Sequence, residues 1–225
     1  MDGQVARDEL IEALARLIAR RRRDGVLRVA VDGPDAAGKT TLADELAPRI
    51  PAPATVIRAG IDSFHRPRAE RLRRGGLSPE GCYHDTFDYD ALRRQLLEPL
   101  GPNGDRRYRT AVFDHREDRP LDEPLRLAPP GSVLICDGVF LLRPQLRHHW
   151  DLRVLLDIDE DEIERRALER DASMMGGADV VRERYRRRYL PAQRLYRAEA
   201  APERFADVLI DNNQPATPRV LAWPK

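Results

Sequence analysis

The stretch VDGPDAAGKTTLADEL, residues 31–46, constrains the fold more than any other part of this 225-residue chain. It contains the pattern G-x-x-x-x-G-K-[ST], with a short β-branched run before it and a helical pattern after it. In that context, backbone N–H groups of the loop and the helix N-terminus surround nucleotide phosphates. We therefore predict an ATP-binding loop. Its expected contacts are Gly33, Pro34, Asp35, Ala36, Ala37, Gly38, Lys39, Thr40 and Thr41.

Lys39 is one of only two lysines in the chain. The other is Lys225, and every remaining member of the 39 basic residues is arginine. An ammonium group on a thin stem can enter a backbone-lined loop and act as a point charge on the β- and γ-phosphates, whereas a planar guanidinium is too broad. We expect Lys39→Arg to largely abolish turnover while the fold stays intact.

The overall charge points to no macromolecular partner. The 39 basic and 38 acidic side chains leave a net charge of +1, which gives no field that attracts nucleic acid or a membrane surface. Cys82 and Cys136 are too few for a disulfide framework, and the N-terminus is charged and amphipathic. We expect a cytoplasmic protein that binds a small molecule, with no nucleic acid or membrane partner; a homo-oligomer is left open.

Five apolar runs predict strands, and helical patterns lie between them. The runs are VLRVAVDG, ATVIRAGIDSF, GSVLICDGVF, DLRVLLDIDE and ADVLIDNN, and the helical patterns cover 5–23, 39–46, 89–97, 160–170 and 180–199. Strands that alternate with helices form a parallel sheet covered on both faces. The expected fold class is α/β: a P-loop NTPase with a parallel five-stranded sheet, helices on both faces and a small lid.

We expect one domain over residues 1–225. Within it, 1–25 contains an N-terminal amphipathic helix, 66–130 contains the acceptor-binding loops and a helix, and 160–185 forms the lid region. The glycines that follow Met174 and Met175 indicate a flexible segment in that lid.

Aspartates follow four of the five predicted strands, at Asp32, Asp62, Asp137 and Asp157. The carboxyl ends of parallel strands meet at one edge of the sheet, where ligands bind. Asp137 ends the apolar run SVLICDG, so together with Thr40 it is a candidate Mg²⁺ ligand. An aspartate after a strand is also an ordinary turn residue.

Several longer stretches resemble the uridine kinase and phosphoribulokinase family of P-loop kinases. They are IDSFH, HDTFDYDALRRQL, CDGVFLLRPQLRHHWDLRVLLDIDEDEIERRALERD and RYRRRYLPAQRLYRAEAAPERFADVLID, and the resemblance covers about 26–212. It implies an ATP- and Mg²⁺-dependent phosphotransferase that acts on a hydroxyl of a small ribose-like metabolite. The first hypothesis for its function is a nucleoside kinase of uridine kinase type.

The resemblance also implies roles for single residues. Asp62 matches the catalytic carboxylate that takes the proton of the acceptor hydroxyl, and Asp85 matches the residue that holds ribose hydroxyls. Arg166 and Arg170 match lid arginines that bind ATP, with Arg170 and Lys39 joining Asp62 as catalytic residues. The other expected acceptor contacts are His65, Phe113 and His115. Turn aspartates and arginines paired with Glu162 or Glu169 are the structural alternatives.

The sequence departs from the family pattern where the acceptor binds. His65 replaces an aromatic residue, FDH at 113–115 replaces the base-recognition stretch, ASMMGGAD replaces a lid loop with further arginines, and Asp137 replaces a glutamate. Recognition of uracil therefore does not follow. The alternatives are a kinase of another acceptor (pantothenate, nicotinamide riboside or a sugar phosphate) and a nucleotide-gated regulatory module that transfers nothing to a small molecule.

Overall fold

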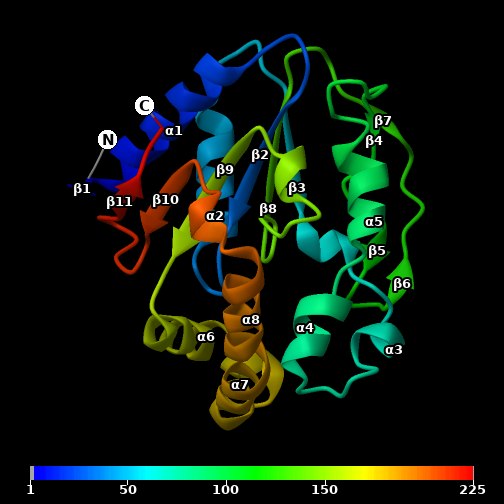
Figure 1. Ribbon diagram of the computed structural model, residues 1–225, viewed down its shortest axis with the longest axis vertical. Helices are drawn as coiled ribbons and strands as arrows, with labels where there is room; N and C mark the ends of the chain where they lie inside the picture. Colours follow the sequence, from blue (N-terminus) through cyan, green and yellow to red (C-terminus); the bar gives the residue numbers. More distant parts are fainter. Residues whose placement is uncertain (1–2, 225) are drawn as a thin grey trace.

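The computed structural model describes residues 3–224, which form a mostly parallel sheet with helices on both faces (Figure 1). Within these residues the sheet has seven strands in the order β1-β11-β10-β9-β2-β8-β3. Their bounds are β1 Gly3–Gln4, β2 Leu27–Asp32, β3 Val56–Gly60, β8 Val133–Gly138, β9 Leu152–Asp157, β10 Val208–Asp211 and β11 Arg219–Ala222.

The five predicted strands are confirmed as β2, β3, β8, β9 and β10, which pair in parallel. The expected number of strands was too low, because β11 pairs antiparallel with β10 and β1 pairs antiparallel with β11. In register, Val31 of β2 and Gly60 of β3 both pair with Asp137 of β8. The carboxyl ends of three neighbouring strands thus lie together.

The helices mostly match the predicted patterns. The α-helices are α1 Arg7–Arg21, α2 Lys39–Leu46, α3 Arg68–Arg71, α4 Pro79–Asp85, α5 Tyr89–Leu92, α6 Glu160–Met175, α7 Ala178–Arg184 and α8 Leu190–Ala200. Two π-helical turns, η3 Arg93–Leu97 and η5 Tyr185–Tyr189, continue α5 and α7. Single 3₁₀ turns are η1 Ala47–Arg49, η2 Ile61–Phe64, η4 Arg147–His149 and η6 Pro202–Arg204.

Two short hairpin-like ladders lie in the region expected to hold acceptor loops. In one, β4 Arg107–Tyr108 pairs with β7 Arg126–Leu127; in the other, β5 Phe113–Asp114 pairs with β6 Arg119–Pro120. Figure 1 shows β5 and β6 on the same side of the molecule as α3, α4 and α5. This region therefore borders the sheet as a group of short elements.

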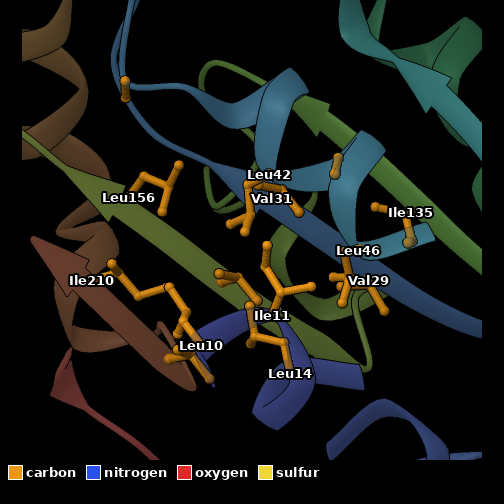
Figure 2. Packing of buried hydrophobic residues seen from close by; sticks show 14 of the residues in the cluster. Leu10, Ile11, Leu14, Val29, Val31, Leu42, Leu46, Ile135, Leu156 and Ile210 are labelled. Atoms are coloured by element: carbon orange, nitrogen blue, oxygen red, sulfur yellow. The ribbon is translucent and has the colours of Figure 1, made fainter. Parts of the chain in front are cut away.

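Each face of the sheet has its own hydrophobic core, because neighbouring strand residues point to opposite faces. Val29 and Val31 of β2 pack with α1 and α2 on one face, as Figure 2 shows. Ala30 between them packs on the other face, with Phe64, Tyr83 and side chains of α5 and α8. Burial on both faces fits the near-continuous apolar runs of the parallel strands.

The segment expected to be flexible begins as helix. Met174 and Met175 belong to the last turn of α6, and Gly176 ends that helix with a φ of +91°. Gly177 follows with a φ of +115° and precedes α7. The two glycines thus make a sharp break between two helices, at φ values that side chains with a Cβ rarely adopt.

None of the helices formed by residues 3–224 combines the length and apolar character that a membrane crossing requires.

Candidate active site

The predicted phosphate loop joins β2 to α2 at the carboxyl edge of the sheet. Gly33 has a φ of +150°, and a Cβ there would lie only 2.5 Å from the backbone oxygen of Leu156. Gly38 has a φ of +85°, and a Cβ there would lie 3.1 Å from Asn212 Nδ2. Asn212 Nδ2 also donates a 2.7 Å hydrogen bond to the Ala37 carbonyl. Both glycines are therefore required by the close packing of the loop on β9 and on the residue after β10.

Arg166 supports this loop from outside the cleft. It donates hydrogen bonds to the carbonyls of Ala36 at 3.3 Å, Asn212 at 2.8 Å and Asn213 at 3.1 Å. Its Nε also bonds Glu162 at 2.6 Å, which is the structural pairing considered above. Arg166 does not line the cleft formed by the described residues, so its position favours a structural role over the expected ATP contact.

The main cleft opens at the carboxyl edge of the sheet and has a volume of about 500 Å³. We call two parts of its lining the phosphate end and the acceptor end. The phosphate end comprises Asp35, Lys39, Thr40, Asp137, Arg170 and Asp171. The acceptor end comprises Asp62, His65, Arg71, Thr86, His115 and Arg188.

Lys39 points its ammonium group back at the loop, with Nζ 2.6 Å from the Pro34 carbonyl oxygen. Burial lowers the pKa of Lys39, and the neighbouring carboxylates Asp35 and Asp32 oppose that shift. Burial likewise raises the pKa of Asp35, against the attraction of Lys39. The ammonium is thus held in a desolvated loop, where a single charge acts strongly on a phosphate.

Asp32 fixes the start of the loop through its own buried carboxylate. It accepts hydrogen bonds from the backbone N–H of Gly33 at 2.8 Å and of Leu142 at 3.1 Å, and from the hydroxyl of Tyr196. Burial raises the pKa of Asp32, and these bonds lower it. Asp32 lies on the predicted edge, but its oxygens are occupied by the protein and do not line the cleft.

Thr40 and Asp137 meet as expected for a metal site. Thr40 Oγ1 donates a 2.6 Å hydrogen bond to Asp137 Oδ2, while Asp137 Oδ1 accepts a 2.9 Å bond from Arg58. A hydroxyl and a carboxylate are oxygen ligands of the kind that Mg²⁺ binds. No cluster of three or more His, Cys, Asp or Glu within residues 3–224 is arranged to hold a metal. The pair therefore fits a Mg²⁺ ion whose remaining ligands are phosphate oxygens and water.

Asp62 reaches the cleft from η2, directly after β3. The end of β3 lies close to the end of β8: a Cβ at Gly60 would lie 3.9 Å from Asp137 Oδ1, and one at Gly138 would collide with Ile61 at 2.3 Å. Glycine at position 138 thus lets the two strand ends approach. Asp62 is exposed and lines the same cleft as Lys39. Its carboxylate can therefore reach a ligand that also contacts the phosphate loop.

His65 and His115 form a stacked pair beside Asp62. Their rings lie 4.7 Å apart with an interplanar angle of 24°, and Phe87 lies 4.6 Å from His65 on another side. His65 Nδ1 lies 2.7 Å from the carbonyl oxygen of Asp62, so that nitrogen carries a proton and donates. Burial lowers the pKa of His65. Both histidines line the cleft, whereas Phe113 is buried in β5 and does not.

Asp85 lies outside the cleft lining of the described residues, contrary to the position that a ribose contact needs. It is 3% exposed at the end of α4, and its two oxygens bind Arg73 and Arg74, each at 2.7 Å. Its hydrogen bond with Arg73 lowers the pKa of this carboxyl, with Arg74 adding to the effect. Asp85 thus fastens the loop between α3 and α4.

Arg170 lines the cleft near the end of α6 and is already paired. It contacts both oxygens of the buried Asp171, at 2.7 Å and 2.9 Å, and Tyr185 donates its hydroxyl to the same carboxylate at 3.2 Å. The bond to Asp171 raises the pKa of Arg170. The sequence predicted Arg170 but missed Asp171 and Tyr185.

Further cleft residues that the sequence did not predict come from short elements around α4. They are Arg71, Cys82, Thr86, Phe87, Arg188 and Tyr189. Burial raises the pKa of Cys82 to about 12, so its thiol remains protonated although Arg188 is close. We assigned these positions no role from the sequence, although Thr86 and Phe87 lie in HDTFDYDALRRQL, and Arg188 and Tyr189 in RYRRRYLPAQRLYRAEAAPERFADVLID, two of the stretches that resemble the kinase family.

No protein-family model matches this sequence. Two curated relatives are uridine-cytidine kinase B of Dictyostelium discoideum, 29% identical over 149 residues, and uridine kinase of Lactobacillus helveticus, 25% identical over 185 residues. The matches cover 66% and 81% of this chain, and 59% and 84% of the relatives. The chain thus spans less than two thirds of the Dictyostelium protein.

Solved structures show the same fold. A provisionally assigned uridine kinase from Bacillus stearothermophilus has a TM-score of 0.70 at 24% identity, with 90% of this chain and 97% of that chain covered. Phosphoribulokinase from Rhodobacter spheroides has a TM-score of 0.58 at 15% identity, with 90% and 76% covered. P-loop kinases in general use ATP with Mg²⁺. In its sequence relatives, its phosphate loop and its fold, this chain is similar to the P-loop kinases of the uridine kinase and phosphoribulokinase family.

Proposed function

We propose that the protein transfers the γ-phosphoryl group of ATP to a hydroxyl of a small ribose-like metabolite, with uridine and cytidine as the first acceptors to test. The observation that carries the proposal is that Asp62 lines the same cleft as Lys39, Thr40 and Asp137. Such a cleft has a carboxylate for the acceptor hydroxyl and a loop for the donor phosphates, which are the parts that phosphoryl transfer needs.

Each residue has a definite task in this reaction. The acceptor oxygen bonds to the γ-phosphorus while the bond from that phosphorus to the β,γ-bridging oxygen breaks, and ADP leaves with the electron pair. Asp62 takes the proton of the hydroxyl. Lys39 balances charge on the β- and γ-phosphates. Thr40 and Asp137 would hold Mg²⁺, which supplies further charge neutralisation when bound.

Arg170 contributes through its charge near the transferred group. In the structure its guanidinium is paired with Asp171 and lies at the open side of the cleft, 55% exposed. Closure of α6 over bound phosphates would bring a cation toward the equatorial oxygens and remove water. We propose this role for Arg170 and not for Arg166, because Arg166 is bound to three backbone carbonyls.

A coupled assay of ADP release tests the proposal. The panel contains nucleosides, pantothenate, nicotinamide riboside and sugar phosphates, each with ATP and Mg²⁺. Asp62→Asn should lower acceptor-dependent release by about a hundredfold or more and leave ATP affinity unchanged. Asp161→Asn, at an exposed position on α6, is the matched control and should behave like the wild type.

One outcome would favour the regulatory module instead. In that case ADP release is slow, does not respond to any acceptor and is the same in Asp62→Asn as in the wild type. Acceptor-dependent release that disappears in Asp62→Asn supports the kinase and identifies its acceptor.

A further inference from the structure

Arg188 is a buried cation in the wall of the cleft with almost nothing to neutralise it. It is 7% exposed and belongs to η5, which packs against α4. Its Nη1 donates a 2.8 Å hydrogen bond to the Gly76 carbonyl, and its guanidinium carbon lies 5.9 Å from the ring centre of Tyr189. Within residues 3–224, no carboxylate oxygen lies within 4.0 Å of its nitrogens. A buried charge without a partner is unfavourable.

Other buried arginines of the chain are compensated. Arg28, 5% exposed, makes two 3.0 Å hydrogen bonds to the carboxylate of Asp151. Arg143, 4% exposed, lies over two aromatic rings, with its guanidinium carbon 4.6 Å from the ring centre of Tyr83 and 4.1 Å from that of Tyr89. Arg188 has neither arrangement. Its free donors are therefore better explained by a ligand than by the fold.

Arg71 is a second cation at the acceptor end whose hydrogen-bond donors are not all paired. Its Nε is buried and has no hydrogen-bond partner among the described residues. Its only ion pair there is a 3.4 Å contact to Asp118, whose side chain is 39% exposed. A pair of that length with a solvated partner is weak.

The rest of the acceptor end offers little negative charge. Asp62 is the one carboxylate among its six residues, and it is the residue assigned to the acceptor hydroxyl. His65 and His115 are stacked on each other, and Thr86 bonds weakly to Gly81 at 3.4 Å. The acceptor end thus carries two arginines against one carboxylate, and that carboxylate already has a task. The other carboxylates of the cleft are engaged elsewhere: Asp137 accepts a hydrogen bond from Arg58, Asp171 from Arg170, and Asp35 lies next to Lys39.

We propose that the acceptor of this kinase is a hydroxylated metabolite with an anionic group, a carboxylate or a phosphate, and that Arg188 together with Arg71 binds that group. The inference rests on the proposed kinase function and narrows its substrate class. An uncharged nucleoside would leave Arg188 buried without a counter-charge. A carboxylate or phosphate would accept hydrogen bonds from the unused donors, and such charge-assisted bonds are stronger than neutral ones.

Matched acceptor pairs, in which one hydroxymethyl group of the neutral member is oxidised to a carboxylate or esterified with phosphate while the other hydroxyls stay, test the proposal. D-Ribose is compared with ribose 5-phosphate, and erythritol with erythronate, so that the two pairs also separate phosphate from carboxylate. Binding is measured by calorimetry on the full chain with a non-hydrolysable ATP analogue and Mg²⁺, and turnover by ADP release. We expect at least one charged member to bind about tenfold or more tightly than its neutral partner.

Variants at two neighbouring positions of η5 assign the effect to Arg188. Arg188→Met keeps the volume of the side chain and removes its charge; it should weaken binding of the charged acceptor by about tenfold to a hundredfold and leave ATP affinity unchanged. Arg187→Met is the control, because Arg187 is 62% exposed and paired with Glu183 at 2.8 Å. Arg188→Gln replaces Arg188→Met if the latter does not fold.

Thermal melting gives a readout that is independent of any acceptor. If Arg188 serves a ligand, the ligand-free Arg188→Met protein should melt at or above the temperature of the wild type, because an unpaired buried charge is gone. A structural role for the bond to Gly76 predicts a lower melting temperature and unchanged selectivity, and that result would overturn the proposal.

Failure of the inference and failure of the kinase function give different results. If neutral acceptors are phosphorylated as well as charged ones, and Arg188→Met has no effect on the ratio, the protein is a kinase and the anionic-acceptor proposal is wrong. If no acceptor in the wider panel stimulates ADP release, the proposed function itself is wrong.

Discussion

The two ends of the cleft balance their charges in different ways. At the phosphate end Lys39 is next to Asp35, and Arg170 is held by Asp171 at 2.7 Å. At the acceptor end Arg188 is buried with a single carbonyl bond, and Arg71 has an unused Nε. The cations of the phosphate end therefore have counter-charges within the protein. The acceptor end lacks a counter-charge that a substrate can supply.

This contrast explains why the phosphate loop was easy to recognise in the sequence. A preorganised loop depends on fixed requirements, such as glycine at 33 and 38, where a Cβ would meet Leu156 or Asn212. The acceptor end depends on side chains that lie on α3, η5 and the turn after β5, three short elements far apart in the chain. Specificity can therefore change there while the phosphate loop stays constant.

The largest effect is expected at the phosphate end. Lys39→Arg should reduce turnover by about a hundredfold or more for every acceptor, charged or neutral, because Nζ sits 2.6 Å from the Pro34 carbonyl in a space that a guanidinium cannot share. Steady-state kinetics with ATP and the best acceptor measure it, and circular dichroism with thermal melting checks the fold. A folded Lys39→Arg protein with nearly normal turnover would contradict the assignment of the loop.

A smaller effect, on the free energy of unfolding, is expected when Arg166, which supports the phosphate loop, is replaced. Arg166→Ala removes hydrogen bonds to three backbone carbonyls and should lower the free energy of unfolding by about 2 kcal/mol. Its neighbour Arg165 is 54% exposed and pairs only with Glu162 and Glu169. Arg165→Ala should cost about 0.5 kcal/mol or less. Urea unfolding of both variants measures the difference, and equal losses would show that Arg166 does not brace the loop.

The parallel part of the sheet was predictable because its strands are buried on both faces and appear as apolar runs. Strand β1 was missed because it is only 2 residues long and pairs across almost the whole chain, and β11 was missed because Val220 is the only buried side chain among its 4 residues. No local sequence pattern predicts that such distant segments pair. At the site, local motifs were enough to select Asp62, His65 and His115. That these three side chains line one cleft was visible only in the structure.

The differences between the expected and the observed positions of site residues have physical causes. Asp85 was expected to hold ribose because its motif matched, but Arg73 and Arg74 bind it from a loop without any periodic pattern. Arg188 was missed because it lies in RYRRRY, where a π-helical turn alters the usual helical spacing. Side-chain spacing for an α-helix cannot indicate which of those arginines is buried.

The smallest effect is expected from pH, and it concerns the acceptor end. Burial lowers the pKa of His65 below its usual 6.5; the carbonyl and charge of Asp62 oppose this shift, while His115 and Arg71 favour it. The folded protein therefore binds fewer protons than the unfolded chain between the lowered pKa and 6.5. The contribution of His65 to stability should be complete above that window and decline as the pH falls through it.

A comparison with His65→Gln isolates this contribution. The free energy of unfolding from urea titrations should fall more steeply for the wild type than for His65→Gln between about pH 7 and about pH 5.5. Bound ribose 5-phosphate or erythronate, whichever binds, should reduce the difference, because an anion at the acceptor end favours the protonated imidazole. Parallel pH profiles for the two proteins would mean that His65 titrates as it does in the unfolded chain. The acceptor end would then be more open to water than the buried Arg188 implies.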